Sequence, residues 1–301
     1  MNESELILSI GVIAALIVLP LVVLMVVRLL VPLDEAPEPE ELEPAPQVAT
    51  LRDYWEGAVP HLRELRDRLL KGMGAIALGT IVGFYLVNSP ALLGETIPNL
   101  LIDHFVPTNV KLQFIGSAEG FVSYMRIALV VGFGIAIPVV VYQLMAFFAP
   151  GLTGREKRVV FIALPFVFEL FVAGVIFGWF FTIPAAIQFL FTYGVNDRVI
   201  AQPSFENFFS TISTLLLWNG LVFELPAIVY LMARLGIVNA KQLAQTRRYA
   251  IVVIVIAAAV ITPTGDPYNL LLLAIPMYLL YELGILLARF VPHRAAPPAA
   301  S

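Results

Sequence analysis

Long apolar runs dominate the chain, and most of them are long enough to form a membrane-spanning helix. The first run covers residues 6–33. Six more runs follow a polar interval, at 70–93, 121–147, 158–182, 207–233, 249–263 and 269–290. Because a helix needs about 20 apolar residues to cross the hydrocarbon core of a bilayer, the pattern predicts an all-α polytopic protein. It has a six-span core and one additional N-terminal span.

Several runs predict an uneven bundle. Residues 249–263 provide only 15 residues, about 22 Å of helix at 1.5 Å per residue, against a hydrocarbon core of about 30 Å. Local thinning of the bilayer or shielding by neighbouring helices must make up the difference. Pro138, Pro226 and Pro276 fall inside spans, where each removes a helix hydrogen bond and favours a kink.

The intervals between the runs predict four segments. Residues 1–33 form the extra helix, which lacks a basic leader and is longer than the 7–15 apolar residues of a cleaved signal, so we expect it to be retained. Residues 34–50 alternate proline and glutamate, which favours an extended, solvated linker. Residues 51–291 form the six-span core and residues 292–301 a cytoplasmic tail.

Composition supports a membrane protein. The 301 residues are 59% hydrophobic and only 13% charged, with a mean hydropathy of +0.89, whereas soluble domains are about 25% charged. The apolar residues come in continuous runs rather than ten-residue alternating segments, which argues against a membrane β-barrel. Cysteine is absent, which excludes disulfides and thiolate metal sites. The net charge of −4 mostly reflects the linker.

Lysine and arginine alternate between the intervals and predict the orientation. Five of them lie in 51–71, whereas the next interval, 94–120, contains only Lys111. The same alternation continues along the core. The positive-inside rule therefore places the start of the core and the C-terminus in the cytoplasm. The extreme N-terminus is then outside, which suits Arg28 near the inner end of the first span.

Enzyme signatures are missing from the sequence. No Walker-type loop, HExxH pair or nucleophile elbow occurs, and His61, His104 and His293 are scattered. We therefore expect a protein that is not an enzyme and that has no metal site and no cofactor.

Ionisable residues inside membrane spans are costly and are functional candidates by default. Glu224 lies deep in the fourth core span, Glu169 near the middle of the third and Arg126 near the outer start of the second, while Asp266 stands at the last outer hinge. Glu224 either binds a polar group or a proton, or it satisfies the kinked backbone beside Pro226. Asp266 also has a structural interpretation, as the cap of the last helix.

The stretch 61–69 precedes the first core span and carries formal charge at five of its nine positions. Its three leucines share one helical face, which predicts a short amphipathic helix at the membrane entrance. Glu64 and Arg68 have the i,i+4 spacing of an ordinary ion pair worth about 0.3–0.5 kcal/mol. Glu156, between Arg155 and Lys157, is equally natural as a solvated charge.

Motifs along the chain resemble one family in order. The stretch 61–69 resembles the HLxELRxRL signature of TatC, the polytopic subunit of the twin-arginine protein translocase. Residues 138–156 resemble the family's P-xxx-YQ-xxx-F-xx-PGL-xxx-E run, and 223–226 resemble its FExP. Residues 262–282 resemble its TP…D…LAxP…YE ending. The resemblance covers about residues 55–290.

The resemblance implies a concave six-span receptor. TatC proteins bind twin-arginine signal peptides of folded cargo at the cytoplasmic face of a bacterial-type cytoplasmic membrane. They work with TatA-like and TatB-like single-span subunits in a multimeric complex, and transport uses the proton-motive force. Lipid is the surrounding partner, and no nucleic-acid partner is expected.

The resemblance also implies roles for single residues. Glu64 and Glu156 match the two glutamates that face the arginine pair of the signal peptide, and a carboxylate takes a guanidinium through paired, charge-assisted hydrogen bonds that lysine does not reproduce. Phe147 matches an aromatic position near this site, and Arg66 belongs to the same signature. The intramembrane and hinge positions match Glu224, Asp266 and Arg126.

Some features depart from the family pattern. Many members have a glutamine after the hinge aspartate, and here Leu270 holds that position beside Asn269. Either Pro98 or Pro90 matches the proline of the first outer loop, and spacing favours Pro98. Glu169 belongs to no family motif, and the helix at 6–33 is an addition.

Two other functions stay open from the residues alone. A proton-coupled small-molecule transporter would use Glu224 and Glu169 as relay groups, and it would need a substrate cavity near the midplane, often built from paired halves. The sequence shows kinks but no paired halves. A structural scaffold, in which the acidic groups only hold helices together, is the third interpretation.

Overall fold

The computed structural model describes residues 51–90, 95–108, 110–148, 154–193, 202–234, 236–262 and 266–291. Within these ranges the side chains of 51–58, 145, 148 and 154–165 are not described. The predicted N-terminal span, the acidic linker and the C-terminal tail lie outside the described residues.

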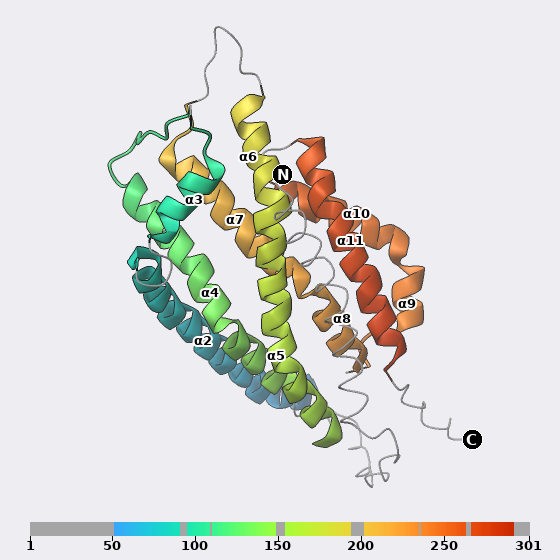
Figure 1. Cartoon of the computed structure of the whole chain (residues 1–301). Helices are drawn as coiled ribbons and strands as arrows, with labels where there is room; N and C mark the ends of the chain where they lie inside the picture. Colours follow the sequence, from blue (N-terminus) through green and yellow to red (C-terminus); the bar gives the residue numbers. More distant parts are fainter. Residues whose placement is uncertain are drawn as a thin grey trace, which may run out of the picture.

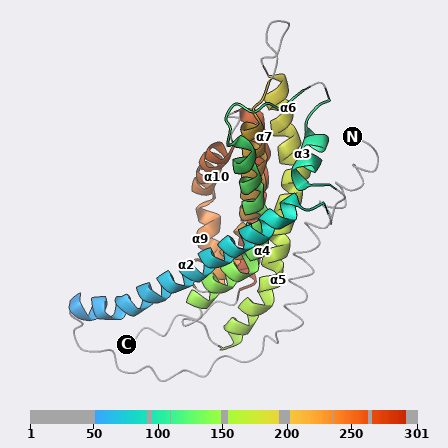
Figure 2. The same cartoon turned by 90° about the vertical axis from the view of Figure 1, so that its left-hand side faces the viewer.

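Helix α2 (Leu51–Asn88) joins the charged stretch 61–69 and the first core span into one element. The sequence predicted a separate short helix and a span beginning at residue 70, and that boundary is wrong. Residues 61–71 are rich in leucine, arginine, glutamate and lysine, which are good helix formers, and no glycine or proline interrupts them. Figure 2 shows the first turns of α2 projecting beyond the other helices.

Helix α4 (Glu119–Phe148) packs along α2 through a close backbone contact. A Cβ at Gly83 would collide with the carbonyl oxygen of Ala128, and one at Gly79 would collide with that of Gly132. Small residues let membrane helices approach closely where no hydrophobic effect drives them together. Figure 1 shows the two helices side by side.

The third predicted span continues past its expected end at residue 182. Helix α5 (Gly154–Phe177), a five-residue π-helical turn (Gly178–Thr182) and α6 (Ile183–Thr192) follow one another without a loop. Pro184 lies just after the π turn. The wider turn accommodates a proline, which lacks an N–H and would clash with the carbonyl four residues earlier. The helix therefore continues where the apolar pattern suggested a boundary.

The fourth predicted span is interrupted, as its proline suggested. Helix α7 (Phe205–Phe223) ends at Glu224, and α8 (Leu225–Arg234) begins directly after it. Pro138 in α4 and Pro276 in α11 (Pro267–Arg289) lie inside helices that remain continuous.

Three shorter helices complete the described chain: α3 (Ile97–Phe105), α9 (Ala240–Gln245) and α10 (Arg247–Ile261). Five helical segments of the described chain are long and apolar enough to cross a membrane: Val59–Asn88, Glu119–Leu144, Phe166–Thr192, Phe205–Arg234 and Pro267–Arg289. α10, with 15 residues, is as short as the sequence predicted. The chain is thus an all-α, multi-pass membrane protein, and its count of full-length spans in the described residues is five.

The core is densest between α4, α6 and α7. Phe208, Phe209 and Ile212 of α7 are fully covered there. A second cluster joins the end of α7 to α10 and α11. Figure 1 shows α2 and α4 at one side of the molecule, α10 and α11 at the other, and α5 between them. Figures 1 and 2 both place the first turns of α2 and α5 at the same end of the molecule.

Candidate functional site

Glu64 lies on α2 near the end of the molecule where α5 begins. Arg68 donates two hydrogen bonds to its Oε1, from Nε at 2.9 Å and from Nη2 at 2.6 Å. The second oxygen, Oε2, lies 3.9 Å from Nδ1 of His61. The i,i+4 pair predicted from spacing is therefore confirmed. Both arginine donors converge on one oxygen, so the other is left to face His61.

His61 connects this carboxylate to the neighbouring helix. Its ring stacks on that of Phe147 near the C-terminal end of α4, with a centroid distance of 4.3 Å and an interplanar angle of 19°. The structure therefore brings Phe147 and Glu64, both named by the family pattern, next to the same histidine. Spacing along the chain did not indicate this contact, because the two rings are 86 positions apart.

Glu156 falls in the first turn of α5, and its side chain lies outside the description. Only five residues separate the end of α4 at Phe148 from the start of α5 at Gly154. Arg66 forms an exposed pair with Asp67, at 2.8 Å between Nη2 and Oδ1. Such a pair between exposed neighbours contributes little to stability.

Glu224 occupies the break between α7 and α8 and is 5% exposed. Its Oε1 is buried and makes no hydrogen bond to any described residue. Asn219, one turn earlier, is fully buried and donates to the carbonyl oxygen of Leu215 at 2.7 Å. The interruption beside Pro226 thus carries a buried carboxylate with an unsatisfied oxygen, which is costly unless the group is protonated or meets a partner.

Asp266 caps α11, which confirms the structural interpretation of this residue. Its Oδ1 accepts from the backbone N–H of Asn269 at 2.8 Å, and its Oδ2 accepts from Nδ2 of Asn269 at 2.7 Å. Both residues are buried. Leu270, at the position where many family members have glutamine, packs against the cluster shared by α10 and α11.

Arg126 has a partner that sequence analysis did not identify. Its Nη2 lies 2.9 Å from Oε1 of Glu206, so the pair ties α4 to the start of α7. Both side chains are more than one-third exposed, at 40% and 37%, which makes this a modest interaction. The only signal in the sequence was that both charges stand near the outer ends of their spans.

A polar cluster around Glu282 connects α10 to α11. In the sequence, Glu282 stood out only as part of the last family motif. Glu282 accepts from Nη2 of Arg247 at 2.7 Å and from the hydroxyl of Tyr278 at 2.8 Å. The hydroxyl of Tyr281 donates to the carbonyl oxygen of Leu243 at 2.9 Å. Tyr281 and Glu282 of the last motif therefore bind α11 to α9 and to the start of α10.

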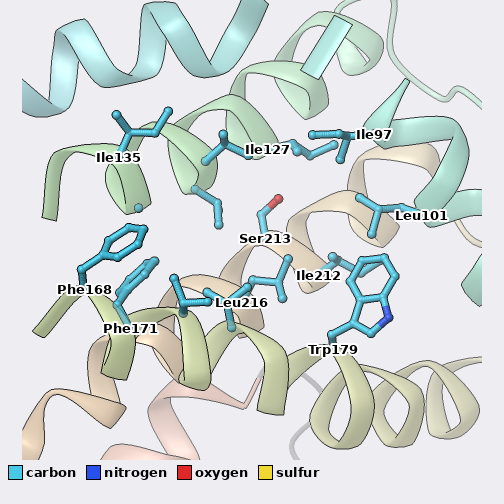
Figure 3. A pocket seen from close by; sticks show the side chains of 15 residues that line it. Ile97, Leu101, Ile127, Ile135, Phe168, Phe171, Trp179, Ile212, Ser213 and Leu216 are labelled. Atoms are coloured by element: carbon cyan, nitrogen blue, oxygen red, sulfur yellow. The ribbon is translucent and has the colours of Figure 1, made fainter. Parts of the chain in front are cut away.

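An apolar cavity of about 330 Å³ lies between α4, α5 and α7, with α3 at one end (Figure 3). Its walls include Ile135, Phe168 and Trp179, and neither Glu224 nor Glu169 belongs to the lining. The cavity therefore lacks the relay groups that a proton-coupled transporter of this design would need. Among the described residues, no group of three His, Cys, Asp or Glu side chains is placed to hold a metal ion.

Comparison with known proteins identifies the family. The family model described as "Sec-independent protein translocase protein (TatC)" matches residues 60–276. The chain is 35% identical over 261 residues to the TatC protein of Deinococcus radiodurans, covering 85% of this chain and 93% of that protein. It is 33% identical over 231 residues to that of Carboxydothermus hydrogenoformans, covering 77% and 92%.

A solved structure agrees. The crystal structure of the twin-arginine translocase receptor TatC is similar with a TM-score of 0.65 and 33% identity, covering 77% of this chain and 99% of that one. The match spans nearly the whole of that receptor chain. The chain therefore belongs to the TatC family: it is a multi-pass, non-enzymatic membrane subunit of a Sec-independent protein translocase, which acts in a complex with other subunits.

Proposed function

We propose that this subunit recognises twin-arginine signal peptides at the cytoplasmic face of the membrane. The observation that carries the proposal is that Glu64 is partly exposed and has only one of its two carboxylate oxygens hydrogen-bonded to Arg68. Its side chain is one-third exposed, both donors of Arg68 use the same oxygen, and among the described side chains the other oxygen faces His61 at 3.9 Å. A guanidinium from outside can approach the second oxygen without first breaking the pair.

Arginine fits this carboxylate better than lysine does. A guanidinium presents several N–H groups in one plane, and two of them can bond a carboxylate at once. An ammonium is a compact charge without that fork. The signal's second arginine then needs a second acidic group, and Glu156 at the start of α5 is our proposed partner for it. Phe147, Arg66 and His61 form the surroundings of the pair.

The positive-inside pattern supports the proposed orientation. Residues 61–71 and the interval before α10 are rich in arginine and lysine, and the interval between α2 and α4 is not. Because the chain contains no cysteine, one introduced cysteine reports its own side of the membrane. An impermeant thiol reagent added to intact cells should label Ser117→Cys and spare Lys241→Cys. Labelling of Lys241→Cys alone would reverse the orientation.

We further propose that TatA-like and TatB-like single-span subunits are the partners and that the proton-motive force drives transport. The family resemblance supports both. The buried carboxylate of Glu224, at a helix break and with Oε1 unsatisfied, is our proposed site for a proton in the described core.

Site-specific cross-linking tests the recognition proposal. A photo-reactive residue replaces Leu62, which is 54% exposed and lies half a turn from Glu64. The matched control replaces Leu78, which is 66% exposed on the outer half of the same helix. We expect an Arg-Arg signal peptide to cross-link at position 62 and not at 78, and a Lys-Lys peptide to cross-link weakly at both.

The glutamate variants complete this experiment. Glu64→Gln and Glu156→Gln, each combined with the probe at position 62, should lower the yield with the Arg-Arg peptide while the protein still inserts. Unchanged yield in both variants, or equal yields for the Arg-Arg and Lys-Lys peptides, would overturn the assignment.

A further inference from the structure

Glu169 lies on the face of α5 that points away from the helical core, and it belongs to none of the translocase motifs. Its side chain is exposed, whereas Val167 and Phe171, two positions before and after it, are 4% and 2% exposed. Two residues turn a helix by about 200°, so Glu169 points away from the core. It makes no hydrogen bond or ion pair with any residue that the structure describes.

The depth of Glu169 makes this exposure costly. Val167 and Phe171 pack with Ile137 of α4 in one cluster, and Ile137 precedes the inner end of α4 at Phe148 by 11 residues, or about 16 Å. That places Glu169 inside a hydrocarbon core of about 30 Å. Acidic groups at this depth almost always face a helix bundle, a water-filled cavity or a partner. A further element should therefore cover this face.

The N-terminal segment 6–33 carries the complementary charge. It is apolar throughout except for one cation, Arg28, and a few small or neutral residues. The acidic linker that follows has 17 residues, which span up to about 56 Å when extended, so the segment can reach α5 from the start of α2. Both Glu169 and this segment depart from the family pattern. Glu169 is a carboxylate without a cationic partner among the described residues, and the segment carries one cation, Arg28.

Arg28 and Glu169 differ in depth along the membrane normal, and their side chains extend toward each other. Arg28 stands five residues, or about 8 Å, from Leu33 at the inner end of its segment. If Leu33 and the end of α4 at Phe148 stand at the same depth, the Cα of Arg28 is about 8 Å closer to the cytoplasm than the Cα of Glu169. Helical side chains lean toward the N-terminus of their own helix. In the proposed orientation, Arg28 leans outward and Glu169 leans inward, so the two groups lean toward each other.

We propose that residues 6–33 dock in the membrane against the outward face of α5, with Arg28 paired to Glu169. The apolar cavity opens beside this face through Phe168 and Val172, which are 41% and 36% exposed. Figure 3 shows Phe168 at one end of that cavity. The docked segment forms a seventh helix of the core.

Cross-linking within one chain tests the docking. In the helix predicted for 6–33, Leu21 shares the face of Arg28 and stands two turns farther out, which the proposed docking makes level with Val172. In the full chain, Leu21→Cys and Val172→Cys are joined by a short bis-thiol reagent, and a protease site in 34–50 is then cut. The fragments should stay together. The control pairs Leu21→Cys with Ile256→Cys, which is 59% exposed on α10, and these fragments should separate.

The ion pair is tested in the same background. Glu169→Leu should lower the yield of the 21–172 link at least fivefold, and exchanging the charges (Arg28→Glu with Glu169→Arg) should restore it. The proposal is overturned by equal linking to positions 172 and 256, by linking to neither, by products that join two chains, or by a yield that Glu169→Leu leaves unchanged. None of these readouts depends on signal-peptide recognition.

Discussion

Glu64 and Asp266 are both acidic residues of family motifs, yet the structure uses them differently. Asp266 is 5% exposed, and both of its oxygens accept hydrogen bonds from Asn269, three positions away. Glu64 is one-third exposed, and its single strong partner is a long side chain that uses only one of its oxygens. The comparison teaches that motif membership alone does not separate a carboxylate proposed to bind a ligand from one that caps a helix. The difference is whether the carboxylate keeps an accessible oxygen that has no hydrogen-bond donor among the described residues.

The largest effect should come from the close contact between α4 and α2, the helix that carries Glu64. Gly83→Leu puts a side chain where even a Cβ would collide with Ala128, and overpacking of this kind costs about 1–3 kcal/mol or more. We expect a lower melting temperature and loss of the His61–Phe147 contact, because α2 must move away from α4. Thermal unfolding in detergent measures this, with Leu78→Ala on the exposed face as control. An unchanged melting temperature would contradict the close packing.

Asp266→Ala should mainly reduce stability. Loss of an N-cap costs about 0.5–2 kcal/mol, and a buried amide left without its acceptor adds about 1–3 kcal/mol. Peptide affinity per folded molecule should not change. Thermal unfolding and peptide titration on the same sample separate the two quantities. A fall in affinity without a fall in stability would mean that the hinge carboxylate takes part in binding.

Glu64→Ala should behave in the opposite way. The lost intrahelical pair is worth about 0.3–0.5 kcal/mol, so the melting temperature should hardly move. A hydrogen bond to a charged group is worth about 1.5–3 kcal/mol, which predicts a 10- to 150-fold loss of affinity for an Arg-Arg peptide. Exposed Asp67→Ala is the matched control on the same helix. A large fall in stability with unchanged affinity would make Glu64 a structural residue.

The smallest effect concerns Arg68, which shares the Glu64 carboxylate with the incoming arginine in this proposal. Arg68→Met keeps most of the apolar stem but removes the guanidinium that holds Glu64. We expect peptide affinity to rise about twofold, because the incoming arginine no longer shares the carboxylate with an intrahelical pair worth about 0.3–0.5 kcal/mol. The measurement is the same titration. A fall in affinity would show that Arg68 orients Glu64 rather than competing for it.

Local features of the site were predictable from sequence, and contacts across the fold were not. The Glu64–Arg68 pair, the short α10 and the Asp266 cap follow from spacing within a few residues. The stacking of His61 on Phe147 and the Arg126–Glu206 pair join residues 80 or more positions apart. No periodic pattern encodes such a contact, and only the packing of α2 and α7 on α4 creates it.

The errors in helix boundaries have the same origin. The apolar pattern marks where a helix enters lipid, not where it begins, so it placed a span from residue 70 after a short helix at 61–69, whereas one continuous helix begins at Leu51. It also ended the third span at 182, although the π turn before Pro184 lets the helix continue to Thr192. Hydropathy therefore located the spans but not the full lengths of the helices, and Glu64 lies in the part of α2 that precedes the predicted span.

The central claim is that Glu64 binds a guanidinium of the signal peptide through paired hydrogen bonds. A double-mutant cycle measures it most directly, with Glu64 or Glu64→Gln on the protein and Arg-Arg or Lys-Lys on the peptide. We predict a coupling free energy of at least about 1.5 kcal/mol, the lower range for hydrogen bonds to charged groups. A coupling near zero, with both peptides equally affected by Glu64→Gln, would contradict the account.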